Sequence, residues 1–326
     1  MAGKGIYYES QFEEATIELL REAHWQYTFG DDIHRKYTDP LIEEDLRNFL
    51  AAQYKDRDLT TSEIDGIVAN LRNTGGQNDY YALRNAFLLY RDGYDFAYSD
   101  GRDNPFRLEY IDFEHPDHNI FRCVNQFVME QGRENRRPDI LLFVNGIPVC
   151  IIELKNPTKQ NATIRDAHTQ ICTRYMRDIP ALLKYCALAV ISDGAKNALG
   201  TIYTPFEFFY EWKKIENEDK AGKGLDTLRT LIRGALSPER ILEILRDYVY
   251  FPDPTKEDDT TEIVCRYPQF FATRKLRDHI LNHLRSVGGD GKGGTYFGAT
   301  GCGKTYTMLF LARQLVLRCK KQLGSP

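Results

Sequence analysis

Three residues in the middle of the chain have the types and spacing of a metal-dependent phosphodiesterase centre. Asp139 follows a proline, and Glu153 and Lys155 come 14 and 16 residues later. Hydrolysis of a phosphodiester at neutral pH needs a divalent cation to generate hydroxide and to neutralise charge developing on phosphorus. Mg²⁺ prefers a few hard oxygen ligands plus waters, so two carboxylates and the Leu154 carbonyl suffice. Lys155 lies on the same strand face as Glu153 and can orient water or stabilise the transition state.

A β-hairpin must position these groups. Ile140–Val144 and Pro148–Glu153 are apolar runs on either side of Asn145-Gly146, a strong tight-turn signal. Their near-continuous apolar character indicates that both faces are covered. The two runs are therefore expected to form a central pair of a sheet.

The register of this hairpin decides whether the two carboxylates can share a cation. A two-residue turn alone would pair Asp139 with Ile152, which places Asp139 and Glu153 on opposite faces. A three-residue loop (Asn145–Ile147) or a bulge pairs Asp139 with Glu153. We expect one of these two arrangements.

The bare motif, PD-x(n)-ExK, also occurs by chance as two surface carboxylates and a lysine at strand ends. Here the residues lie at the rim of a strongly apolar hairpin, where a Glu-x-Lys pair needs a reason to be retained. That context favours a catalytic site over a chance arrangement of surface charges.

Hydrophobic periodicity predicts the elements around the hairpin. A helix is expected to begin at Ser10, which forms a capping box with Glu13. The expected helices cover Ser10–Ala23, Pro40–Tyr54, Thr61–Asn73, Asp79–Tyr90, Thr163–Arg177, Leu225–Ala235, Pro238–Val249 and Phe270–Leu284, and the other expected strands cover Arg107–Glu114, Cys123–Glu130 and Ala187–Ser192.

Composition limits the class of protein. The 326 residues can hold two domains, and 42% hydrophobic with 28% charged residues is typical of a globular chain. A net charge of −4 argues against indiscriminate coating of nucleic acid. Seven scattered cysteines show no zinc-site spacing and indicate a reducing compartment. With no leader and no apolar run long enough for a membrane span, we expect a cytoplasmic protein.

A second motif lies near the end of the chain. A glycine-rich turn entering a helix points backbone amides at phosphates, and this one has the P-loop spacing for ATP. We expect a strand at Thr295–Phe297 before it and a helix at Tyr306–Leu317 after it. The expected nucleotide-binding residues are Gly298, Thr300, Gly301, Cys302, Gly303, Lys304 for the phosphates and Thr305 for Mg²⁺.

The chain resembles the N-terminal nuclease domain of type I restriction enzyme R (motor) subunits. The resemblance rests on Asn125–Phe127, Arg136–Pro148, Ile152–Pro157, Tyr185, Ser192–Gly194 and the stretch from Thr204 to Phe209. It implies an α/β fold: a PD-(D/E)xK restriction-endonuclease-like mixed sheet flanked by helices, at 1–215, followed by linker helices and a truncated RecA-like P-loop domain at 216–326. It also implies an ATP- and Mg²⁺-dependent endonuclease that works beside methyltransferase and specificity subunits.

The resemblance suggests roles for further residues. Glu13 matches an acid on the first helix, about eleven residues before a Gly-aromatic pair, although His24 replaces the glycine and a capping role is the alternative. Gln170 matches a post-catalytic Gln-x-x-x-Tyr pattern, but Tyr175 is one residue too far away. Gln269 resembles the adenine-reading glutamine of related helicases, with helix capping as the alternative.

DNA is the expected substrate, held through its phosphates by a basic cluster. Its candidate members are Arg133, Arg136, Arg137, Lys159, Arg165, Arg174, Arg177 and Lys184. No acidic motif or second lobe follows the P-loop, so the ATP site is expected to be incomplete. Two alternatives stay open: a nuclease–helicase fusion of the type III or repair kind, and a non-catalytic module that docks partner subunits.

Overall fold

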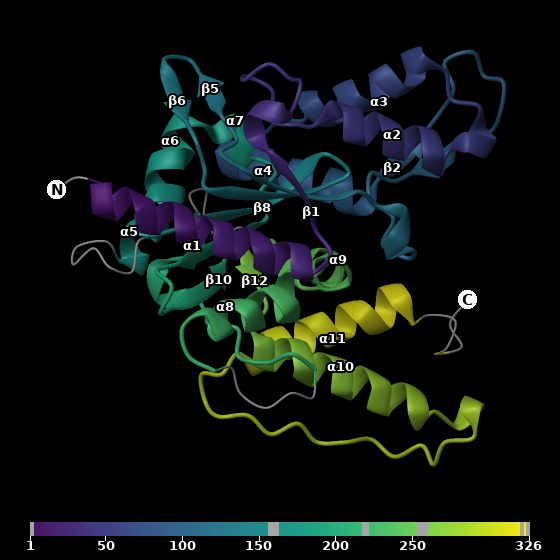
Figure 1. Cartoon of the computed structure of the whole chain (residues 1–326). Helices are drawn as coiled ribbons and strands as arrows, with labels where there is room; N and C mark the ends of the chain where they lie inside the picture. The colour runs from purple at the N-terminus through teal and green to yellow at the C-terminus, as the bar shows by residue number, and fades with distance from the viewer. Residues whose placement is uncertain (1–2, 156–162, 217–221, 253–259, 320–322, 324–326) are drawn as a thin grey trace.

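A six-stranded mixed sheet forms the centre of the molecule, and helices cover it (Figure 1). The computed structural model describes residues 3–155, 163–216, 222–252, 260–319 and 323. Neighbouring strands pair antiparallel except β1 with β4 and β8 with β9, which are parallel. In sheet order the strands are β1 (Gln26–Phe29), β4 (Phe121–Asn125), β7 (Ile140–Val144), β8 (Ile147–Leu154), β9 (Leu188–Ser192) and β10 (Asn197–Gly200). The expected mixed α/β core is confirmed.

Helices surround this sheet. The first helix lies along the sheet against β1 and β8, and the helix after the hairpin packs on β8 and β9 (Figure 1). Their bounds are α1 (Gly3–Glu22), α2 (Glu43–Gln53), α3 (Thr61–Asn73), α4 (Asp79–Asp92), α5 (Ile164–Thr169), α6 (Met176–Asp178) and α7 (Pro180–Leu183). Three small antiparallel ribbons join β2 (Tyr94–Phe96) to β3 (Phe106–Leu108), β5 (Met129–Gln131) to β6 (Glu134–Arg136), and β11 (Val249–Tyr250) to β12 (Ile263–Val264).

The hairpin of β7 and β8 is the most buried part of the sheet. Every residue of both strands is buried, as the continuous apolar runs predicted. Asn145 and Gly146 both have positive φ, 51° and 76°, which is the conformation of a type I′ turn. A Cβ atom on Gly146 would overlap the carbonyl oxygen of Ile42, so glycine is required here for space as well as for conformation.

A bulge sets the register of this hairpin. Val144 lies opposite Ile147, so the turn itself has only two residues, but Leu142 lies opposite Cys150 and leaves Val149 without a partner. Beyond the bulge Ile140 lies opposite Ile152. Continuing this register by one residue places Asp139 opposite Glu153. The bulge alternative is therefore confirmed, and the three-residue loop is not formed.

Three local expectations were wrong. The first helix begins at Gly3 rather than Ser10, so the capping box with Glu13 does not form at its start. Arg107–Glu114 is a strand only as far as Leu108. The run expected at Cys123–Glu130 is interrupted by Gln126, whose φ of 54° turns the chain between β4 and β5. Left-handed residues end strand pairing because they turn the backbone out of the extended region.

The last third of the chain is mainly helical and packs below the sheet (Figure 1). It holds α8 (Leu225–Leu231), which continues as a π-helical turn, then α9 (Pro238–Asp247), α10 (Tyr267–Asn282) and α11 (Lys304–Arg318). The Trp25 indole donates a 2.7 Å hydrogen bond to the carbonyl of Leu236, and the apolar core is continuous across both parts. The division into domains at residue 215 stays a prediction, and the expected linker after it lies partly outside the described residues.

The strand expected at Thr295–Phe297 is not formed. Residues 291–299 have no assigned secondary structure, and Phe297 is 89% exposed. A strand needs a neighbour for its backbone N–H and C=O groups, and no described strand pairs with this segment. The RecA-like fold therefore stays a prediction. Among the described helices, none is long and apolar enough to cross a bilayer.

The end of α1 yields a stability prediction. His24 follows the helix with φ of 71°, and the Trp25 N–H donates to the Leu20 carbonyl at 3.1 Å. This left-handed position strains an L side chain but not glycine. We expect His24→Gly to raise the free energy of unfolding by about 1 kcal/mol, measured by urea denaturation. His24→Val should lower it, and the reverse order of the two variants would contradict the strain.

Candidate active site

The two predicted carboxylates meet at the open end of the central hairpin. Asp139 directly precedes β7, and its Oδ2 accepts a 2.7 Å hydrogen bond from the Leu154 N–H. The Glu153 side chain is only 1% exposed. Burial, followed by the negative charge of Asp139, raises the pKa of Glu153 to about 8. Water cannot solvate the Glu153 carboxylate, so its charge depends on the groups around it.

Three side chains enclose Glu153 in a ring of hydrogen bonds. The Lys155 ammonium donates to Glu153 Oε1 at 2.7 Å and to Gln170 Oε1 at 2.8 Å. The Gln170 amide donates to the Tyr175 hydroxyl at 2.6 Å, and this hydroxyl donates to Glu153 Oε2 at 3.3 Å. Both oxygens of Glu153 and both ends of the Gln170 amide are thereby used. The ring fixes the carboxylate on the Lys155 side of the strand.

The extra residue between Gln170 and Tyr175 is absorbed by a π-helical turn. Gln170–Tyr175 forms a π-helix between α5 and α6. A π-helix bonds residue i to residue i+5, so side chains five apart share a face, as side chains four apart do in an α-helix. The two side chains are in hydrogen-bond contact despite the departure from the Gln-x-x-x-Tyr spacing.

Glu13 lies beside the same strand end, held by two amides. Its Oε1 accepts from the Asn125 side chain at 2.7 Å, and both its oxygens accept from the Gln126 side chain at 3.1 Å. The backbone N–H of Gln126 in turn donates to the Asp139 carbonyl at 3.2 Å. Helix α1 thus connects to the active-site strand through Glu13, which carries no helix-capping role. His24 adopts the left-handed conformation for which glycine is usual at its position.

The donor set suits a hard divalent cation. Asp139 and Glu153 offer only carboxylate oxygens, the ligands that Mg²⁺ prefers. Burial, followed by the neighbouring charge of Asp139, raises the pKa of Glu153, and Lys155 and Tyr175 offset this only in part. A cation beside Asp139 and Glu153 would supply the missing charge, so the residues present fit a Mg²⁺ site. The Leu154 carbonyl stays a predicted third ligand.

The expected basic cluster divides into two groups. Arg136 and Arg177 each lie 2.6 Å from the buried Asp178, and Lys184 donates to backbone carbonyls. Arg165 stacks over the Phe206 ring. Lys159 lies outside the described residues. The remaining members are exposed and form no ion pair within the described part of the chain: Arg133, Arg137 and Arg174.

The predicted phosphate loop precedes α11 as expected. Gly301 and Gly303 both have φ of 80°, and a Cβ atom on Gly303 would overlap the Gln269 amide nitrogen. Lys304 is folded back on the loop, donating to the carbonyls of Gly298 and Ala299 at 2.8 and 3.0 Å. The Lys304 ammonium is thus hydrogen-bonded to carbonyls of the loop itself.

Gln269 connects this loop to α10. Its Oε1 accepts from the Arg266 N–H at 2.8 Å, which is the capping contact expected as the alternative to base reading. Its amide nitrogen donates to the Gly303 carbonyl at 3.3 Å. The reading of adenine by Gln269 stays a prediction.

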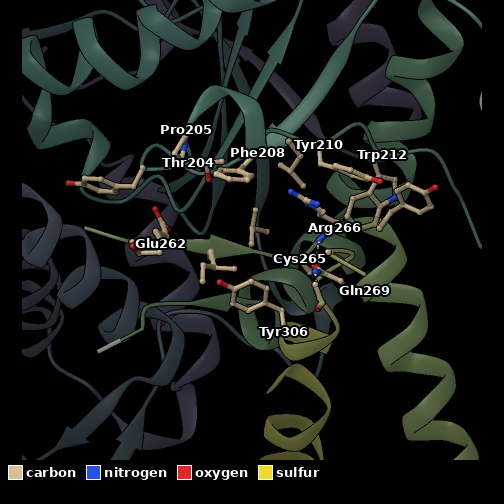
Figure 2. Close-up of a pocket in the computed structure, with 18 of the residues that line it drawn as sticks. Thr204, Pro205, Phe208, Tyr210, Trp212, Glu262, Cys265, Arg266, Gln269 and Tyr306 are labelled. Carbon is tan, nitrogen blue, oxygen red and sulfur yellow. Dashed lines mark hydrogen bonds between the residues drawn. The ribbon is translucent and has the colours of Figure 1, made fainter. Parts of the chain in front are cut away.

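A pocket of about 640 Å³ lies beside the loop. Figure 2 shows aromatic side chains along its wall, with Arg266 and Gln269 at one side and Glu262 at the other. Arg266 stacks over the Tyr210 ring at 4.7 Å, and Tyr306 reaches the pocket from α11. Flat aromatic walls next to a glycine loop can accept a planar base.

Sequence reasoning did not assign roles to Asn125, Gln126 and Tyr175. The paired amides directly after a strand were a usable signal, since adjacent side chains with two N–H donors can hold a carboxylate. Tyr175 was considered but could not be placed without the π-helical turn. The contacts of Asn125 and Gln126 join residues far apart in the chain, and the contact of Tyr175 with Gln170 needs an irregular helix.

The raised pKa of Glu153 gives a prediction for chelated protein. Since the folded pKa is about 8 and the ordinary value is 4.5, the folded state keeps its proton where the unfolded state loses it. The free energy of unfolding should therefore fall as pH rises from 5 to 8, by at most about 1.4 kcal/mol per unit. Urea denaturation in EDTA measures this slope.

Glu153→Gln should flatten that profile, because the amide has no proton to lose. Glu130→Gln, a matched change at an exposed glutamate, should leave the slope unchanged. Identical profiles for wild type and Glu153→Gln would rule out burial of the titrating carboxylate.

Comparison with known proteins gives a consistent result. Residues 6–208 match the family model described as type I restriction enzyme R protein N terminus. The type I restriction enzyme HindI endonuclease subunit of Haemophilus influenzae is 28% identical over 320 residues, covering 94% of this chain and 30% of that protein. The putative type I restriction enzyme MjaIXP endonuclease subunit of Methanocaldococcus jannaschii is 27% identical, covering 96% and 32%.

A second M. jannaschii protein, the putative type I restriction enzyme MjaVIIP endonuclease subunit, is 33% identical over 63% of this chain and 19% of its own length. The chain spans about a third of the length of the first two relatives.

Proposed function

The chain belongs to the family of type I restriction enzyme R proteins, and we propose that its hairpin site hydrolyses DNA phosphodiester bonds with Mg²⁺. The observation that carries this proposal is the convergence of Asp139, Glu153 and Lys155 at one strand end, with Glu153 buried and incompletely compensated. The names of the relatives favour type I restriction over a type III or repair fusion. The proposed partners are DNA and, by family, methyltransferase and specificity subunits.

The arrangement assigns a task to each group. Bound Mg²⁺ would act as a Lewis acid and lower the pKa of its water. Asp139 and Glu153 would hold the cation, and Glu153 would have to release its proton first, so cation affinity should rise with pH. Within the described residues Lys155 makes these two contacts, and a third N–H can serve the attacking water or the phosphate.

Two further groups position this centre. Gln170 and Tyr175 keep the Lys155 ammonium and the Glu153 carboxylate on one face of the strand. Glu13 positions the backbone of Asp139 through Gln126, whose N–H donates to the Asp139 carbonyl. The exposed arginines around the site, Arg137 among them, can contact DNA phosphates without reading base sequence.

The glycine loop supports a second, nucleotide-binding role in the same chain. Amides at the start of α11 can bind phosphates, and the adjoining aromatic pocket can take the base. Lys304 must leave the carbonyls of Gly298 and Ala299 to reach a phosphate. This rearrangement costs binding energy, which favours weak ATP binding by this chain.

Cleavage of supercoiled plasmid tests the nuclease proposal. Slow, sequence-independent nicking is expected with Mg²⁺ or Mn²⁺ and not with EDTA. Asp139→Ala, Glu153→Gln and Lys155→Ala should each lower the nicking rate on the order of 100-fold or more. The first two variants lose a proposed cation ligand, and the third loses the positive charge next to the reacting phosphate. Quantitative gel analysis measures the rate.

Asp95→Asn is the matched control, because it removes an exposed carboxylate on β2. It should nick like the wild type. Nicking that persists unchanged in Glu153→Gln would exclude this hairpin as the source, and complete absence of nicking by well-folded wild type would favour the docking-module alternative.

Isothermal titration tests the nucleotide site. We expect ATP with Mg²⁺ to bind with a dissociation constant on the order of 1 mM, and binding to disappear in Lys304→Ala. Gln269→Ala should weaken ATP binding relative to the wild type, because the phosphate loop loses its contact with α10. Micromolar affinity with steady ATP turnover would overturn the proposal of a weak, incomplete site.

A further inference from the structure

A cluster of one aspartate and two histidines lies apart from the hairpin site, in the loop between β3 and β4. The Asp112 Oδ2 atom lies 3.2 Å from His115 Nδ1 and 3.0 Å from His118 Nδ1. All three atoms lie within 4.8 Å of one another. The Asp112 side chain is 4% exposed, whereas those of His115 and His118 are 64% and 49% exposed.

Local structure explains why the three groups converge. Pro116–His118 forms a 3₁₀-helix, in which side chains three positions apart lie above one another. The two imidazole rings are accordingly stacked, with centroids 4.8 Å apart and planes 24° from parallel. Asp112 Oδ1 accepts the backbone N–H groups of Glu114 and His115, which leaves Oδ2 directed at the rings.

The donor set and its spacing fit a borderline-soft metal ion. Two imidazole nitrogens and one carboxylate oxygen are the ligands of many Zn²⁺ sites, and ligand atoms about 2.0–2.1 Å from a tetrahedral ion lie about 3.3 Å apart. The two separations from Oδ2, 3.2 and 3.0 Å, are close to that edge. The exposed rings leave a fourth position open to water.

Surrounding contacts support the aspartate as a ligand. The Gln53 amide donates to the same Oδ2 atom at 3.1 Å, which orients the carboxylate as partners of metal ligands do. Asn119 binds both backbone groups of Asp112, at 2.9 and 2.7 Å. These contacts hold the aspartate in place without using the two histidines.

We propose that Asp112, His115 and His118 form a binding site for one Zn²⁺-class transition-metal ion. This site is distinct from the proposed Mg²⁺ site, whose ligands are carboxylate oxygens. It ties the loop to the sheet, because Asn119 also accepts from the Asn145 amide in the turn of β7 and β8 at 2.8 Å. The ion therefore stabilises the turn end of the central hairpin.

Titration of the full chain with Co²⁺ tests the site, using untagged protein freed of metal. With Mg²⁺ in excess to occupy the hairpin site, the expected result is saturable uptake of one equivalent of Co²⁺, seen as visible d–d absorption bands, and competition by Zn²⁺. The His115→Ala/His118→Ala variant should bind at least about 100-fold more weakly. Both side chains are about half exposed or more, and the His115 side chain makes no cap hydrogen bond to the 3₁₀-helix, so the variant should keep the fold, as circular dichroism checks.

Two control variants locate the ion. His34→Ala removes an exposed histidine outside the cluster, and Asp95→Asn removes an exposed carboxylate on β2; both should bind Co²⁺ like the wild type. Zn²⁺ should raise the thermal unfolding midpoint of the wild type and of both controls, but not of the double variant. Absence of saturable uptake would show that the imidazoles only donate hydrogen bonds to Asp112, and unchanged uptake by the double variant would place the ion elsewhere. Either result overturns the proposal.

Discussion

The candidate active site depends on keeping the Glu153 carboxylate out of water beside Asp139. A buried carboxylate with a second one nearby is costly, and the raised pKa of Glu153 expresses that cost. Lys155 and Tyr175 offset part of it by donating to both carboxylate oxygens. A bound cation would offset the rest. These electrostatics support the proposal that the site binds a cation.

Three local irregularities of the backbone, each involving one extra or unusual residue, bring the side chains of the site together. The bulge at Val149 brings Asp139 opposite Glu153, which a regular hairpin with a two-residue turn would not do. The π-helical turn brings Gln170 within reach of Tyr175. His24 takes a left-handed conformation so that β1 can start directly after α1. Each irregularity compensates for a residue type or a spacing that differs from the regular pattern. It has a local energetic cost, but the contacts at the site still form.

The helical last third of the chain is less completely buried than the central sheet. Its phosphate loop has no flanking strand, and Phe297, Met308 and Val316 are more than half exposed. Apolar side chains on α11 lack a covering layer within the described residues, although the same helix packs Phe310 against Tyr248. The helix thus packs on the core from one side only. The loop's lysine is satisfied by the loop's own carbonyls in this arrangement.

The sequence by itself determined the hairpin, a tight turn at Asn145-Gly146, its burial and the residue types at its open end, because apolar runs and Asn-Gly are local signals. It also predicted α3 from end to end and the start of α4. Only the tertiary structure decided which register the hairpin takes, whether Gln170 meets Tyr175, and that Glu13 binds the Asn125 and Gln126 amides instead of capping a helix. Those outcomes depend on a bulge, a π-helical turn and contacts between residues over a hundred positions apart. The local sequence pattern contains no information on which of these forms is lowest in energy. The strand expected before the phosphate loop was wrong for the same reason: pairing partners, not propensity, make a strand.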